Sequence, residues 1–457
     1  MATIGAALNA FSSFMWGTPL VVLLVGGGVF FVLHSRGLPY RHFRHGFEII
    51  TGKYDADSGD QGDISHFKAL ATALSGTLGL GNITGVAVAI TVGGPGAVFW
   101  MWITAIIGIA TKFYTASLAV MFRGRDDAGH LQGGPMYVIR EGLGRRWLPL
   151  AWLFCIAALF GTLPIFQINQ LVQIIRDVVA VPAGLTLADD HLVFDLVLGV
   201  VFSAMVFAVI VGRIHRIANV TSRVVPFMVI FYFVLTAILL VQNAAEIPGA
   251  LALIVSDAFS GQSVAGGAVG TVILIGVQRG AFSNEAGIGT ESLAHGAART
   301  NEPIREGLVA MIGPFVDTLI VCTCTALAIL VTGAWQTDAV GVTMTSNAFE
   351  SAFPGFGGLL LVVMVFFLSI STVLTFSYYG GKCAGFLFGT RYERWYIWFY
   401  TVLIIVGAAA SLRAVIGLID GMYATMAIPT MVSSLLLAPK VRAAAKDYFA
   451  RLKASGS

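Results

Sequence analysis

Long apolar runs constrain this chain more than any other feature. Of its 457 residues, 57% are hydrophobic and only 11% are charged, whereas soluble domains carry about 25% charged residues. A run of about 20 apolar residues can cross a lipid bilayer as one helix. The sequence therefore predicts an all-α polytopic membrane protein that forms a single transmembrane domain over residues 1–457. By length, the runs predict eleven transmembrane helices, at roughly 16–34, 66–92, 96–121, 149–175, 192–212, 220–242, 266–295, 307–333, 357–380, 396–411 and 415–437.

The basic residues predict how these helices are oriented. If the loop after the first helix is cytoplasmic and the sides alternate, 23 of the 27 Lys and Arg residues fall in cytoplasmic loops or in the tail. This predicts an N-terminus outside and a cytoplasmic C-terminal tail at 438–457. No Lys or Arg precedes Arg36, so the first apolar run is interpreted as a retained helix rather than a signal peptide.

Two of the predicted helices are interrupted by glycine-rich polar segments. Residues 75–82 read "SGTLGLGN" in the second helix, and residues 277–292 read "VQRGAFSNEAGIGTES" in the seventh. If the N-terminal helix 16–34 is set aside, the interruptions occupy the first and sixth of ten helices. Matched interruptions of this kind are typical of inverted-repeat transporters. We therefore expect one extra helix followed by two five-helix repeats, 66–242 and 266–437.

An unwound segment inside a membrane must line a cavity or bind a ligand, because each unpaired backbone group in lipid costs several kcal/mol. Freed carbonyl groups suit a small cation, and the N-terminus of a half-helix favours a carboxylate. Sodium and a zwitterionic substrate would satisfy both features. The alternative is that the glycines only permit close helix packing, as the four-residue spacing of Gly81 and Gly85 allows.

Other polar side chains lie inside predicted spans. Gln167 in "TLPIFQINQ" is the preferred ligand-side amide, with hydrogen bonding between helices as the alternative. Ser371 and Thr372 are predicted to bind a cation together with carbonyl groups of the first interrupted helix, unless they bond only to their own helix. Sodium is the expected ion because it prefers hard oxygen ligands.

Asp317 is the ionisable residue placed most clearly inside the membrane. Such residues are functional candidates, and Arg279 or a freed backbone group is its expected partner. A purely structural ion pair is the alternative. Lys112 and Asp420 also fall within spans and are left unassigned.

Little in the sequence indicates an enzyme. It contains no zinc-binding helix motif, no serine elbow and no phosphate-binding loop. A net charge of +3 gives no indication of nucleic-acid binding, and no obligate protein partner or cofactor is evident. The four cysteines are expected to be reduced and unbridged. A channel and a sensor that binds without transport remain as rival classes, and a membrane enzyme is a weaker one.

Several blocks, taken in order, resemble the alanine/glycine:cation symporter family, and the resemblance covers nearly the whole chain. It implies a leucine-transporter-like fold, a bacterial inner-membrane location, and uptake of alanine or glycine coupled to sodium, or alternatively to protons. The blocks are "GDISHFKALATALSGTLGLGNITGVAVAI", "GGPGAVFWMWITAIIGIATK", "GGPMYVI", "RGAFSNEAGIGT", "GPFVDTLIVCT" and "SYYGGKC".

The resemblance also implies roles for individual residues. The implied substrate-binding residues are Thr77, Gly79, Gly81, Asn82, Gln167, Phe282, Ser283, Asn284 and Phe376. The implied sodium site consists of Ser75, Leu78, Leu368, Ser371 and Thr372.

Four positions depart from the usual family pattern. Phe376 stands where tryptophan is common, which would reshape the pocket, and Thr115 stands where an acidic residue is common. Glu291 and His295 follow the second interruption, where small residues are usual. We expect both to be solvated at the cytoplasmic mouth, although they leave room for an effect of protons.

Overall fold

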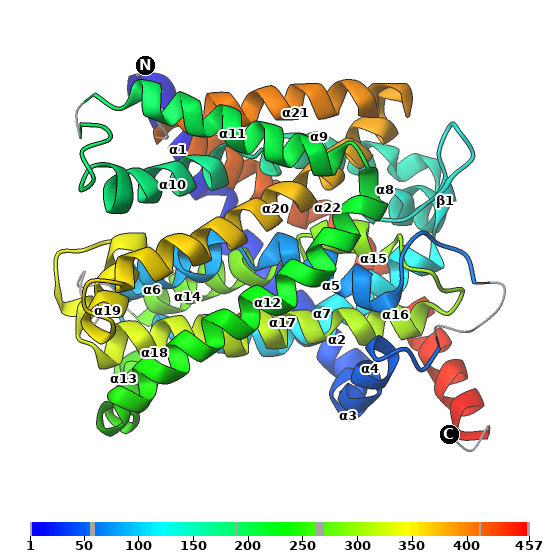
Figure 1. The fold of residues 1–457 in the computed structure, drawn as a ribbon. Helices are drawn as coiled ribbons and strands as arrows, with labels where there is room; N and C mark the ends of the chain where they lie inside the picture. The colour runs from blue at the N-terminus through cyan, green and yellow to red at the C-terminus, as the bar shows by residue number, and fades with distance from the viewer. Residues whose placement is uncertain (1, 55–59, 188–189, 261–268, 411–412, 455–457) are drawn as a thin grey trace.

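The structure is a computed structural model that describes residues 2–54, 60–187, 190–260, 269–410 and 413–454. Within these ranges the regular secondary structure is helical apart from one small antiparallel hairpin, β1 (Gly124–Arg125) and β2 (Leu131–Gln132), and one isolated parallel bridge between Ile64 and Ala298. Figure 1 shows most of the long helices running along one common direction. The all-α prediction is confirmed. The helices are α1 (Ala2–Met15), α2 (Thr18–His34), α3 (Leu38–Arg41), α4 (Phe43–Ile50), α5 (His66–Thr77), η1 (Leu80–Asn82), α6 (Thr84–Gly93), α7 (Ala97–Met121), α8 (Pro135–Tyr137), η2 (Val138–Leu143), η3 (Arg145–Trp147), α9 (Leu148–Gly161), α10 (Ile165–Ile175), η4 (Arg176–Ala180), α11 (Leu192–Ile210), α12 (Arg213–Gln242), η5 (Ala244–Glu246), α13 (Ile247–Ser260), α14 (Val269–Asn284), α15 (Thr290–His295), α16 (Pro303–Ala310), α17 (Ile312–Pro314), η6 (Phe315–Cys322), α18 (Thr323–Val331), η7 (Ala334–Gln336), α19 (Val342–Ala352), α20 (Gly357–Phe388), α21 (Arg391–Ala409) and α22 (Arg413–Ala454).

The helices give a smaller number of membrane spans than the apolar runs predict. Eight helices in the described part of the chain are long and apolar enough to cross a membrane, or nine if the bent pair α5 and α6 counts as one span. α14 and α21 lie where two further spans are predicted but do not meet that test. The structure therefore supports a polytopic membrane protein, while the count of eleven and the two-repeat arrangement stay predictions.

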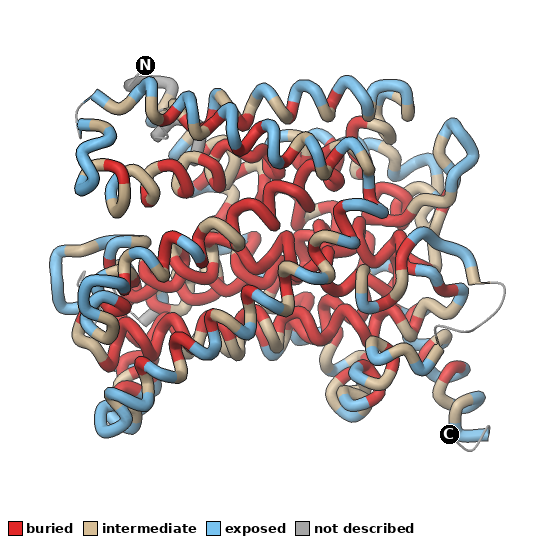
Figure 2. Tube along the Cα trace, viewed as in Figure 1, coloured by how far each residue is buried: buried red, intermediate tan, exposed pale blue. Residues whose placement is uncertain are grey.

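The outer helices present apolar side chains outward, as contact with lipid requires. α11, α12 and α21 expose large hydrophobic residues, among them Val193, Phe227, Ile230, Trp395 and Phe399. Figure 2 shows the buried residues gathered in the middle of the bundle, around α5, α15 and α20. The polar groups of these inner helices are thus shielded from lipid by the outer ones.

Glycines let the second interrupted helix approach its neighbour closely. A side chain at Gly276 of α14 would lie 2.5 Å from the Ala97 carbonyl oxygen of α7, and one at Gly280 would lie 3.1 Å from the Met101 Cα. This packing holds α14 against α7 and positions the end of α14 at the centre of the protein.

All four cysteines are free and buried. This confirms the prediction that they form no disulfide.

Candidate functional site

The first interruption breaks its helix where the sequence predicts. α5 ends at Thr77, Gly79 adopts an extended conformation (φ −124°, ψ −158°), and the chain resumes through η1 into α6 with a bend of 61°. The Asn82 side chain supports the turn, since its Oδ1 accepts a hydrogen bond of 3.2 Å from the Gly79 amide. The break is therefore an ordered turn that a side-chain hydrogen bond stabilises.

The second interruption also breaks its helix. α14 ends at Asn284, and Glu285, Gly287 and Gly289 all have positive φ angles before α15 begins at Thr290. Asn284 Oδ1 accepts a 3.0 Å hydrogen bond from the Ala286 amide and so forms a turn directly after α14. Both predicted interruptions are confirmed as breaks in the backbone.

The two breaks meet at one small cavity of about 40 Å³. Six of the nine residues predicted to bind substrate line it: Thr77, Gly79, Gly81, Gln167, Phe282 and Phe376. Gln167 reaches the cavity because α10 begins just after another, shorter interruption, which separates α9 from α10 at residues 162–164. Its buried Oε1 has no hydrogen-bond partner among the described residues, so a ligand donor would satisfy it.

The predicted sodium-site residues also lie together, where α20 crosses α5. Thr372 Oγ1 donates to the Ser75 carbonyl oxygen at 3.0 Å, and Ser75 Oγ donates to the Ser371 carbonyl oxygen at 2.7 Å. The Ser371 and Thr372 hydroxyls both contact the Leu368 carbonyl oxygen, as the alternative of bonding within their own helix expects. Leu78 is fully buried and shares a small apolar cavity with Leu368. The oxygens of two helices therefore face one another, which a cation site requires.

Three predicted substrate residues lie outside the central cavity. Asn284 bonds to the turn that follows α14, and Asn82 and Ser283 bond to Asp317. Asn82 Nδ2 donates to Asp317 Oδ1 at 2.6 Å, and Ser283 Oγ donates to Asp317 Oδ2 at 2.8 Å. Asp317 thus joins the two breaks to each other, next to the cavity.

The expected partner of Asp317 is wrong in one respect. Arg279 lines a different cavity, of about 170 Å³, together with Asp420. The charge of Arg279 acts on the Asp420 carboxylate of α22. Hydrogen bonds from side chains, and not a cation, hold the Asp317 carboxylate in the described structure.

The prediction that Glu291 and His295 are solvated is also wrong. Both are fully buried, because α15 packs between α5 and α7. Glu291 Oε1 accepts a 2.8 Å hydrogen bond from Thr115 Oγ1, and His295 Nδ1 lies 2.5 Å from Glu306 Oε1. His66, at the start of α5, contacts the other oxygen of the same Glu306 carboxylate.

Sequence reasoning missed several residues of the central cavity. Gly161, Ile419 and Tyr423 come from parts of the chain that carry no unusual polar pattern, so no sequence signal indicates them. Phe166 stands next to Gln167 but is itself apolar, so the polar pattern did not single it out. Glu285 was also missed, although the sequence does carry a signal for it. It stands within the second glycine-rich segment and is an acid inside a predicted span.

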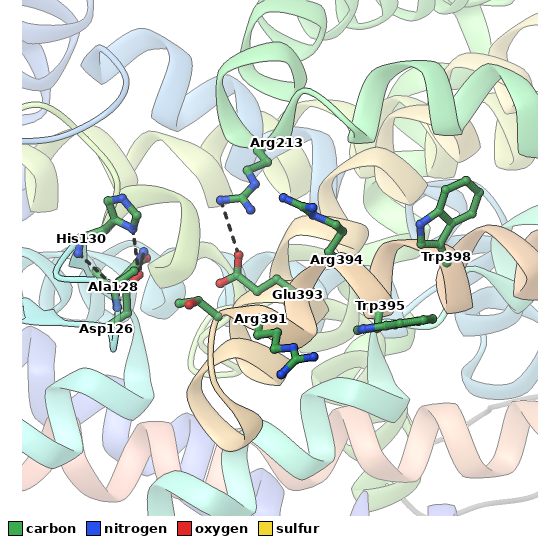
Figure 3. A pocket seen from close by; sticks show the side chains of 11 residues that line it. Asp126, Ala128, His130, Arg213, Arg391, Glu393, Arg394, Trp395 and Trp398 are labelled. Atoms are coloured by element: carbon green, nitrogen blue, oxygen red, sulfur yellow. Dashed lines mark hydrogen bonds and ion pairs between the residues drawn. The ribbon is translucent and has the colours of Figure 1, made fainter.

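A larger cavity lies away from the two breaks. It has a volume of about 600 Å³ and lies between the β1–β2 hairpin and the start of α21. Figure 3 shows His130 beside Asp126 on the hairpin, and Arg213 beside Glu393 of α21. A neighbouring cavity of about 280 Å³ shares Arg213 and reaches Lys382 of α20. No predicted site residue lines either one.

We expect Asp317→Asn to destabilise the protein. Both carboxylate oxygens accept hydrogen bonds, so the new amide nitrogen would replace an acceptor either of Asn82 or of Ser283 and Thr318, and a buried hydrogen bond would be lost at a cost of about 1–3 kcal/mol. The measurement is thermal unfolding in detergent, with Asp177→Asn as the control because the Asp177 side chain is 53% exposed. Equal stability of the two variants would contradict a structural role for the Asp317 carboxylate.

Taken together, two interrupted helices that meet at one small buried cavity in a bundle of apolar helices define a membrane transporter rather than an enzyme. The sequence profile of the sodium:alanine symporter family matches residues 1–457, and the chain belongs to this family.

Curated relatives agree over nearly their full length. An uncharacterized transporter of Haemophilus influenzae is 38% identical over 99% of this chain and 97% of its own. The sodium/alanine symporter AgcS of Methanococcus maripaludis is 39% identical over 96% of both chains. A probable sodium/glutamine symporter, GlnT of Bacillus subtilis, is 32% identical over 96% of this chain and 90% of its own.

Proposed function

We propose that this protein imports small neutral amino acids, chiefly alanine and glycine, together with sodium by alternating access. The observation that carries the proposal is that residues of both broken helices, Gly79 and Gly81 from one and Phe282 from the other, line the same buried cavity. A site shared by two broken helices can open to either side when one set of helices rocks against the other. The two-repeat architecture and the outside N-terminus are part of this proposal.

The size and lining of the cavity favour a small zwitterion. One water needs about 10–15 Å³ measured in the same way, so a cavity of about 40 Å³ suits only a few non-hydrogen atoms. The amide of Gly81, which lines the cavity, donates no backbone hydrogen bond in the described turn and is available to a carboxylate. Phe282 and Phe376 offer an apolar wall to a short side chain.

Sodium is the coupling ion that the oxygens at the crossing of α5 and α20 suit best, since it prefers hard oxygen ligands. The available energy is sufficient. One charge moved through 100 mV releases about 2.3 kcal/mol, and a tenfold sodium gradient adds about 1.4 kcal/mol. Together they would support roughly a 500-fold substrate gradient for each sodium ion.

The test is uptake of radiolabelled alanine into proteoliposomes with an inward gradient of sodium, of potassium, or of protons. Transient accumulation with sodium alone would support the proposal, and counterflow of preloaded alanine would separate a carrier from a channel. Binding without accumulation under any gradient would indicate a sensor and contradict the proposal.

Proton coupling is the second candidate. A relative from Bacillus subtilis, 35% identical, is described as a putative sodium/proton-dependent alanine carrier. The fully buried carboxylate of Asp317, which links the two breaks, is a group that a proton could neutralise. Accumulation with the proton gradient and not with sodium would favour this alternative.

We expect Phe376→Ala to relax selectivity for size. Removing the ring enlarges the cavity beside Tyr423, so alanine should bind about tenfold more weakly and larger neutral amino acids should compete better. Competition of unlabelled methionine and leucine against labelled alanine measures the effect. Phe388→Ala is the control, because Phe388 is exposed at the end of the same helix. An unchanged order of competitors would show that Phe376 does not limit the size of the substrate.

A further inference from the structure

Glu285 combines burial, access to the central cavity and an unusual backbone. Its side chain is only 2% exposed, and it lines the same cavity as Gly79 and Gln167. It stands in the second break, between the end of α14 and Gly287.

The backbone of Glu285 is held in the left-handed region, with φ 56°. This conformation costs a non-glycine residue roughly 1–2 kcal/mol, whereas glycine adopts it without penalty. Among the described residues only Arg36 and Arg213 share it outside glycine, and both lie at helix junctions away from the cavity. The neighbouring break positions are glycines, Gly287 and Gly289. A carboxylate kept at the one strained non-glycine position of the break is a sign of function.

The charge of Glu285 is only partly compensated. Its carboxylate accepts a hydrogen bond from Thr290 Oγ1, and the Tyr423 hydroxyl lies within its reach. Among the buried carboxylates of the described residues, those of Asp195 and Glu306 form ion pairs, and that of Glu285 forms none.

The other charges near Glu285 do not balance its negative charge. Lys112 of α7 is the cation that acts on Glu285, but it acts on Asp317 as well. Glu291 adds a further negative charge on the same side. A buried carboxylate that forms no ion pair is stabilised when a ligand brings a positive charge beside it.

We propose that the Glu285 carboxylate binds the ammonium group of the substrate, with Gln167 Oε1 as a second acceptor on the same cavity. The substrate carboxylate then points toward the free amide of Gly81 in the other break. Each end of the zwitterion thus contacts a different broken helix. Substrate binding therefore depends on how the two broken helices lie relative to each other. This inference rests on the proposed function, because it takes the ligand to be a zwitterionic amino acid.

The test compares two ligands that differ only in the group that Glu285 would bind. Alanine and lactate carry the same carboxylate and methyl group, but lactate has a hydroxyl in place of the ammonium. Their affinities for purified full-length protein in sodium buffer are measured by calorimetry, or by competition against labelled alanine. The variants are Glu285→Gln, Glu285→Asp and, as a matched control, Glu291→Gln, since Glu291 is equally buried but lies outside the cavity.

We expect Glu285→Gln to weaken alanine binding at least about 30-fold and to leave the affinity for lactate nearly unchanged, because only a bond to a charged group is lost. Glu285→Asp should recover part of the affinity for alanine, and Glu291→Gln should keep the wild-type preference. A purely structural role would instead weaken both ligands together.

Two results would overturn the inference: alanine affinity within threefold of wild type in Glu285→Gln, or an equal loss in Glu291→Gln. Failure of the proposed function looks different, because the wild-type protein itself would then bind no amino acid, and the inference would fall with it.

Discussion

Replacing Thr372 by alanine is expected to raise the sodium concentration for half-maximal alanine uptake by about 100-fold, because a hydrogen-bonding or ligating oxygen next to a charge contributes about 1.5–3 kcal/mol. Thr372 is the side chain that links α20 to the Ser75 carbonyl oxygen of the first broken helix. Its loss should therefore weaken the ion site and the contact between the two helices together. Sodium titrations of uptake into proteoliposomes measure the change.

The same helix provides the control. Ser369 is fully buried, and its hydroxyl has no partner among the described residues, so Ser369→Ala should leave sodium activation within about twofold of wild type. Thr372→Ser keeps the oxygen and should recover most of the sodium affinity. If Thr372→Ala transports with normal sodium dependence, the coupling ion binds elsewhere.

Replacing Gly79 by alanine is expected to lower alanine transport at least about 100-fold. The added methyl group would lie 2.9 Å from Thr372 Oγ1 and 3.4 Å from Gln167 Nε2. It would therefore intrude between the predicted ion site and the predicted substrate site. The Gly79 backbone is extended, with φ −124°, and alanine adopts it without strain, so the effect reports the lost space alone.

Gly85→Ala tests whether any methyl group near the first break has this effect. A side chain at Gly85 meets no heavy atom within 4 Å, and the residue lies within α6, where alanine is favoured over glycine. This variant should transport normally and unfold at the same or a higher temperature. Equal losses in the two variants would mean that helix flexibility, and not the site, was disturbed.

The central features of the fold could be predicted from the sequence because they follow from local physical chemistry. Apolar runs longer than a bilayer is thick must be helices, since lipid offers the backbone no other hydrogen-bond partners. Clusters of glycine and polar residues within such runs must break them, and α5 and α14 end at Thr77 and Asn284, inside the predicted segments. The family resemblance then indicated nine substrate-binding residues, and six of them line one cavity.

The hydrogen bonds between polar groups of different helices could not be predicted. They depend on how the helices pack, which the sequence of one segment does not determine. Arg279 was an expected partner of Asp317, but the way α14 packs on α7 gives that place to Ser283 and Asn82. Glu291 and His295 looked like mouth residues because they follow a break, yet the contacts of α15 with α5 and α7 enclose them.

The sequence by itself determined the helical membrane class and the two breaks, because these depend on the hydrophobicity and backbone preference of neighbouring residues. Its resemblance to a known family indicated a part of the cavity lining. Only the tertiary structure decided that Glu285 faces the cavity while Asn82 and Ser283 face Asp317. The direction of a side chain at a helix break is set by the strained turn and by helices far away in the chain, so it emerges only when those helices are packed together.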